Sequence, residues 1–104
     1  MDLSENRKLR IFLAKIKKNF GPCKVFLFGS RAKGESWRQS DYDMIIVSEK
    51  FKEMHWLTRI RNIMKYWDLE HNLDVLPYSF EEFEFKKKEF SFMREILKKS
   101  KNLA

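Results

Sequence analysis

The segment from Val25 to Val47 constrains the fold of this 104-residue chain more than any other part. It reads VFLFGSRAKGESWRQSDYDMIIV, so two short apolar runs enclose a Gly-Ser pair and a polar connector. The first run, Val25–Phe28, is β-branched and aromatic and stops at a glycine, which is typical of a strand that is buried on both faces. We therefore expect a central strand here and a second strand over residues 41–47.

The turn after the first predicted strand has the residue types of a phosphate-binding loop. Gly29 has no Cβ, so the backbone can turn sharply there and a bulky phosphate can come close. The Ser30 hydroxyl and the amides after it can hydrogen-bond that phosphate, and Arg31 adds a fixed positive charge. A Gly-Ser pair after a strand is usually only a turn, so this interpretation depends on the motif that follows it.

Two aspartates open the second predicted strand. Asp41 and Asp43 are two residues apart, so a strand would place both carboxylates on the same face. Two like charges this close repel each other unless a cation lies between them, and Mg²⁺ takes carboxylate and phosphate oxygens as ligands. An Asp-x-Asp can also be solvated or cap a loop. Its position after the Gly-Ser turn favours a metal and nucleotide triphosphate site.

A third acid lies in the short apolar run Leu73–Pro77, which we predict to be a third strand. A lone carboxylate in such a run is costly to bury, so Asp74 needs a partner, unless the strand lies at the edge of the sheet and Asp74 faces water. A predicted helix separates this strand from the second one. That order suits a crossover between two parallel strands.

Two segments, FGSRAKG (28–34) and SDYDM (40–44), resemble the signature of the minimal nucleotidyltransferases of the DNA polymerase β superfamily. The resemblance implies an α/β (α+β) fold, with a small mixed β-sheet flanked by helices. It also implies two Mg²⁺ ions that carry the α-phosphate of a nucleotide to an acceptor hydroxyl. The implied nucleotide-binding residues are Gly29, Ser30 and Arg31, and the implied metal-binding and catalytic residues are Asp41, Asp43 and Asp74.

The N-terminal segment Ser4–Phe20 has the apolar spacing of an amphipathic helix, with Ser4 as its cap and Gly21-Pro22 at its end. Its outer face is basic, and the net charge of +7 arises within residues 1–40. This charge could attract nucleic acid, offset the carboxylates and the incoming triphosphate, or reflect a hyperthermophile composition. Nucleic acid is the less favoured partner, because no stacking motif or recognition helix accompanies the charge.

Two further helical regions are expected. Residues 51–67 place their apolar side chains on one helical face, and Ser79 with Glu82 forms a candidate capping box that opens a region through about Lys99. Three lysines at 86–88 mark a break in that region. The phenylalanines of residues 80–92 exceed what one helix face can bury. They either contact another chain, a partner protein or a second copy, or belong to a helix that wraps two sides of a small core.

The length of the chain is that of a single domain, residues 1–104, with room for one site. No apolar stretch approaches the roughly 20 residues of a membrane span, and the first residues lack the apolar core of a signal peptide, so we expect a cytoplasmic protein. The single cysteine, Cys23, excludes an internal disulfide. His55 and His71 lack zinc-ligand spacing and are expected at the surface or at helix caps.

The expected activity is transfer of a nucleoside monophosphate, with ATP as the expected donor and Mg²⁺ as the metal. Minimal nucleotidyltransferases of this kind are commonly paired with a small helical HEPN protein, and some act as antitoxins by transferring AMP to that partner. The resemblance therefore implies a protein acceptor. Two alternatives remain: an antitoxin that acts by binding alone, and an enzyme that modifies a small molecule.

Overall fold

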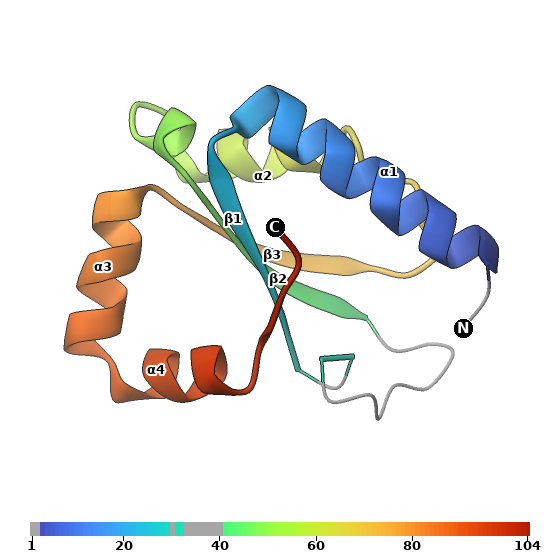
Figure 1. The fold of residues 1–104 in the computed structure, drawn as a ribbon. Helices are drawn as coiled ribbons and strands as arrows, with labels where there is room; N and C mark the ends of the chain where they lie inside the picture. The colour runs from blue at the N-terminus through green and yellow to red at the C-terminus, as the bar shows by residue number, and fades with distance from the viewer. Residues whose placement is uncertain (1–2, 30, 33–40) are drawn as a thin grey trace.

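The computed structural model describes residues 3–29, 31–32 and 41–104, whose arrangement Figure 1 shows. In chain order the elements are α1 (Leu3–Phe20), β1 (Cys23–Phe28), β2 (Tyr42–Ser48), η1 (Glu49–Phe51), α2 (Trp56–Met64), β3 (Leu73–Tyr78), α3 (Phe80–Glu89), α4 (Ser91–Lys98) and β4 (Lys101–Asn102). α1 and α2 lie on one side of the sheet, and α3 and α4 lie on the other (Figure 1). The predicted fold, a small mixed sheet flanked by helices, is confirmed.

Among the described residues the sheet has four strands, in the order β3-β2-β1-β4. β1 pairs antiparallel with β2 and with β4, whereas β2 pairs parallel with β3. α2 connects the two parallel strands, which confirms the expected crossover. β1 is an interior strand, as predicted, although β4 pairs with it over two residues only.

The side chains of β2 alternate between two apolar layers. Met44 and Ile46 belong to the larger layer, which α1 closes with residues such as Phe12. Ile45 and Val47 belong to the smaller layer, under α3 and α4. The pleat of this one strand therefore divides the core into two parts.

The expectation that the first strand is buried on both faces holds for one face only. Val25 and Leu27 are buried in the larger layer, but Phe26 and Phe28 on the other face are half-buried. Phe26 stacks on Phe83 of α3, with 5.7 Å between ring centroids. Since α3 and α4 leave part of this face open, the strands can present polar groups there.

The predicted helix over residues 51–67 is wrong at both ends. The chain forms η1 first, and α2 begins only after His55, whose Nδ1 accepts a hydrogen bond from the backbone N–H of Leu57. The expected capping role of His55 is thus confirmed. α2 ends at Met64, and Trp67 lies beyond it, where its ring meets Phe12 edge-on.

The first helix ends where its sequence predicts. Gly21 closes α1 by donating its backbone N–H to the carbonyl of Lys17, and a Cβ at Gly21 would lie 2.3 Å from that oxygen. The expected start is wrong by one residue, because α1 begins at Leu3 and Ser4 therefore lies inside the helix. No helix in the described ranges is long and apolar enough to cross a membrane.

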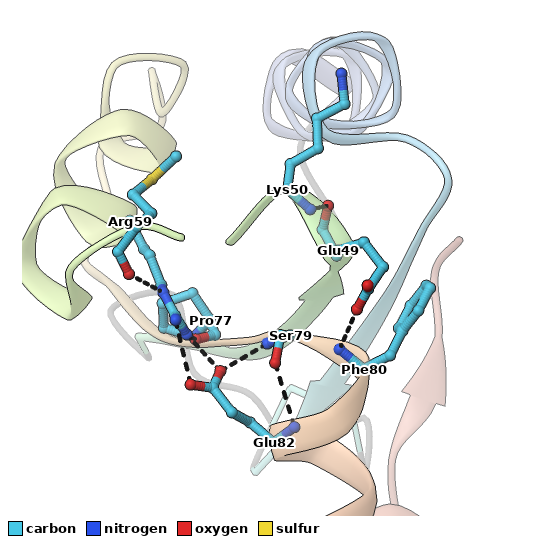
Figure 2. Close-up of polar contacts among 9 residues, drawn as sticks. Glu49, Lys50, Arg59, Pro77, Ser79, Phe80 and Glu82 are labelled. Carbon is cyan, nitrogen blue, oxygen red and sulfur yellow. Dashed lines mark hydrogen bonds and ion pairs between the residues drawn. The ribbon is translucent and has the colours of Figure 1, made fainter. Parts of the chain in front are cut away.

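The capping box of Ser79 and Glu82 is confirmed at the start of α3 (Figure 2). Glu82 also binds Arg59 of α2, with Nη1–Oε1 and Nη2–Oε2 distances of 2.5 and 3.2 Å. Arg59 is 5% exposed and further donates to the carbonyls of Met54 and Pro77. This buried arginine fastens α2 to the end of β3 and the start of α3, a role that its position in the helical pattern does not suggest.

Candidate active site

Two of the predicted carboxylates lie side by side on neighbouring strands. The register pairs Phe28 of β1 with Asp43 of β2, and Asp43 with Asp74 of β3. Residues paired in this way point to the same face of the sheet. Asp43 is half-buried and Asp74 is exposed. Both acids thus lie on the face that α3 and α4 leave partly open.

The surroundings of Asp43 disfavour its charged form. Burial raises the pKa of the Asp43 carboxyl above its ordinary value, and the negative charge of Asp74, a hydrogen bond with Asp74 and the charge of Asp41 raise it further. Two carboxyl groups can share a hydrogen bond only when one of them carries a proton. With a cation bound between them, both carboxylates could stay charged without a shared proton, so this pair suits a positively charged ligand.

Gly29 brings the turn after β1 directly against this pair. Its φ angle is +77°, in the left-handed region that glycine adopts without a steric cost. A Cβ at this position would lie 2.6 Å from Oδ2 of Asp43. The predicted proximity of the turn and the carboxylates is therefore present. Ser30, the other half of the predicted phosphate-binding pair, lies outside the described residues.

The donor set suits Mg²⁺ in chemistry, since all the acids supply oxygen ligands. Asp41 precedes β2, is exposed, and acts on Asp43 through its charge. Within residues 3–29, 31–32 and 41–104, however, no three His, Cys, Asp or Glu side chains already form a metal-binding group. The structure thus brings Asp43 and Asp74 into contact, whereas Asp41 is exposed and lies just before β2.

Arg31, predicted beside the phosphate, lies on the opposite face of the sheet. Its Nη1 is 2.8 Å from Oε1 of Glu5 and 3.1 Å from the hydroxyl of Tyr42, and its side chain is 6% exposed. The guanidinium also lies over the Tyr42 ring, 4.1 Å from its centroid. Because Tyr42 precedes Asp43 in β2, its ring points away from the carboxylate pair and into the larger core layer.

Two further members of this second cluster, Glu5 and Tyr42, were given no role from the sequence, and a third, His71, was expected at the surface or at a helix cap. The Tyr42 hydroxyl donates to Glu5, and Nε2 of His71 lies 3.5 Å from the same carboxylate. Burial raises the pKa of Tyr42, and the hydrogen bond to Glu5 raises it further. The alternation of β2 signals that Tyr42 points away from the aspartates. Glu5, in the first turn of a basic helix, carries no comparable signal.

A recess of about 350 Å³ adjoins the carboxylates. It is lined by Phe28, Ile60, Leu73, Asp74, Val75 and Leu76. Its walls are apolar apart from Asp74, which therefore offers the charged group in this recess. The recess lies at the β3 edge of the sheet.

Comparison with known proteins agrees with this geometry. A solved crystal structure of a candidate nucleotidyltransferase from Sulfolobus solfataricus is similar in fold, with a TM-score of 0.61, 23% identity, and coverage of 95% of this chain and 81% of that chain. No curated protein matches the chain at a significant level. The model of the family described as "Polymerase beta, Nucleotidyltransferase" matches residues 13–104. The chain therefore belongs to the polymerase β nucleotidyltransferase family.

Proposed function

We propose that this protein transfers AMP from ATP to a hydroxyl group of a partner protein in the cytoplasm, with Mg²⁺ as its cofactor. The contact between Asp43 and Asp74, directly beside the Gly29 turn, is the observation that carries the proposal. Two acids on the open face of a sheet, next to a left-handed glycine, form a place where a cation and a phosphate can meet.

Each site residue has a role in this scheme. Gly29 and Ser30 bind the triphosphate in the turn that Arg31 completes, and Asp41, Asp43 and Asp74 would hold two Mg²⁺ ions. Such ions lower the pKa of the acceptor hydroxyl and neutralise the leaving pyrophosphate.

Asp74 has a further task, because it lines the recess at the edge of the sheet and is placed to orient the acceptor hydroxyl. The acceptor oxygen bonds to the α-phosphorus while the bond to the pyrophosphate breaks. Orientation of this kind contributes to the chemical step more than to nucleotide affinity.

A protein acceptor is supported by exposed apolar surface. Phe85 and Phe92 are 56% and 57% exposed, and Phe90 is 38% exposed, all on α3 and α4 or the residue between them. Large aromatic side chains are enriched at protein interfaces. The family resemblance suggests a small helical HEPN protein as the partner, so that the chain is the antitoxin of a pair.

The same aromatic surface also favours a second candidate function, inhibition of that partner by binding alone. This function needs no carboxylate pair, and it leaves the contact between Asp43 and Asp74 without a purpose. Transfer to a small molecule in the recess at the β3 edge is a third outcome that the same experiment detects.

The test is incubation of the protein with ATP labelled at the α-phosphate, Mg²⁺ and the product of the adjacent reading frame. Mass spectrometry of that partner should find an added AMP that is lost with Asp43→Asn and retained with Asp68→Asn, an exposed aspartate outside the site. An unmodified partner that the Asp43→Asn protein neutralises as well as wild type would leave the binding function. Label in a small molecule would exclude the protein acceptor.

A further inference from the structure

The cluster of Glu5, Arg31, Tyr42 and His71 joins four parts of the chain on the side of the sheet opposite the carboxylate site, and His71 belongs to the segment before β3. Glu5 lies in the first turn of α1, Arg31 follows the Gly29 turn, and Tyr42 opens β2. One carboxylate oxygen of Glu5 accepts from both Arg31 and the Tyr42 hydroxyl. The helix is thereby tied to the two segments that build the candidate site.

The turn after β1 and the start of β2 each place one residue on either side of the sheet. Gly29 touches Asp43 on the open side, whereas Arg31, two residues later, is buried against Glu5 on the helix side. Tyr42 and Asp43 are divided in the same way by the pleat of β2. The distance between the turn and the carboxylates on the open side therefore depends on how Arg31 and Tyr42 are held on the helix side.

Glu5 is well suited to hold them. Its side chain is 16% exposed and that of Arg31 is 6% exposed, so their ion pair is largely shielded from water. Breaking a buried pair of this kind is costly, because the remaining charge is left without compensation. The stacking of the guanidinium on the Tyr42 ring adds a second contact between the turn and β2.

We propose that Glu5 is a positioning residue for nucleotide binding: it fastens Arg31 and Tyr42 together and so sets the Gly29 turn against Asp43. In this arrangement Arg31 acts as an anchor of the turn and does not contact the triphosphate. The inference rests on the proposed function, since it assigns to Glu5 an effect on MgATP affinity at that site.

The chain supplies a matched control in its other buried arginine pair. Arg59 and Glu82 are also joined by a short ion pair, in which the arginine is as buried as Arg31 and the glutamate is 44% exposed. This pair lies at the opposite end of the strands, next to Pro77 and away from Asp74. Glu82→Gln therefore weakens a comparable pair without touching the nucleotide site.

The experiment measures MgATP affinity by calorimetric titration and stability by thermal melts, for wild type, Glu5→Gln and Glu82→Gln. Both variants should melt at lower temperature. Only Glu5→Gln should bind MgATP more weakly, by about tenfold, the effect of losing one hydrogen bond to a charged group. Tyr42→Phe, which removes only a hydroxyl, should also weaken MgATP binding. It provides the test if Glu5→Gln fails to fold.

Three results would overturn the inference, and they are distinguishable. Equal MgATP affinity in Glu5→Gln and Glu82→Gln would make Glu5 a purely structural residue. Tighter binding in Glu5→Gln would mean that Glu5 restrains an Arg31 that reaches the phosphates. A wild-type protein that does not bind MgATP at all would refute the proposed function, and the assignment of Glu5 with it.

Discussion

Replacement of Gly29 by alanine should separate the stability of this protein from its chemistry. A residue with a Cβ at φ +77° costs about 1–2 kcal/mol of unfolding free energy relative to glycine. The new Cβ would lie 2.6 Å from Oδ2 of Asp43, which is the far end of a side chain that can rotate away. An off-rotamer side chain adds about 0.5–1.5 kcal/mol. The total expected loss is about 1.5–3.5 kcal/mol.

The loss of nucleotide and metal binding should be larger than this loss of unfolding free energy suggests. A rotated Asp43 no longer faces Asp74, so Gly29→Ala should lose the thermal stabilisation that Mg²⁺ and ATP give to wild type. Urea titrations with and without MgATP measure both effects.

A double-mutant cycle with Asp43→Ala isolates the contact between Gly29 and Asp43. Without the Asp43 carboxylate, the alanine at position 29 should cost only the backbone part, about 1–2 kcal/mol. A Gly29→Ala protein with wild-type stability and wild-type response to MgATP would refute the left-handed turn and its contact with Asp43.

Three other variants give simpler expectations. Asp43→Asn should abolish transfer, yet it should raise the melting temperature of the metal-free protein because it removes like-charge repulsion. Activity assays check the first effect, and thermal melts without Mg²⁺ check the second. An active or destabilised variant would contradict the assignment of Asp43. Asp74→Asn should impair turnover more than nucleotide affinity, and single-turnover rates together with binding titrations would show the difference. Unaltered turnover would mean that Asp74 is only a solvent-facing residue of an edge strand, as its sequence context also allows. Arg59 hydrogen-bonds Glu82 and holds the pKa of that carboxyl below its ordinary value, so this pair stabilises the fold at neutral pH and the stabilisation is lost as the pH falls. Glu82→Gln should therefore be less stable than wild type at pH 7. In urea titrations this difference should shrink as the pH falls through the ordinary pKa of glutamate and then through the lowered pKa of Glu82, and a constant difference would exclude the ion pair as its cause.

The strands and the acids were predictable because their signals are local. The apolar runs around Gly29 and the Asp-x-Asp motif have the composition and length of buried strands, and a helix between two strands indicates parallel pairing. That pairing puts Asp74 on the strand next to Asp43, and the register seen in the structure then pairs the two residues directly. The start of α2 at Trp56 was missed, because the apolar spacing continues on the N-terminal side of His55, where the chain forms η1 and a turn before the helix begins.

The contacts of Arg31 were the hardest part to predict. An arginine after a Gly-Ser turn suggests a phosphate ligand, and nothing in the sequence points to Glu5 as the acid that binds it. Its partner Glu5 is 26 positions away, on the face of a helix whose other charges are solvated. The ion pair of Arg59 could not be predicted for the same reason, because its partner Glu82 belongs to another helix. Contacts of this kind depend on how helices pack, which local periodicity does not encode.

The alternation of β2 also protects the protein against misalignment of its own strands. A slip of one position would turn Asp43 inward among the apolar side chains and expose the Tyr42 ring. An unpaired carboxylate in that layer carries a severe desolvation penalty, and Glu5 and Arg31 would lose their shared hydroxyl. The acids of the candidate site therefore destabilise misaligned pairings of β2 during folding. The residues proposed for catalysis thus also help to select the correct register of the sheet.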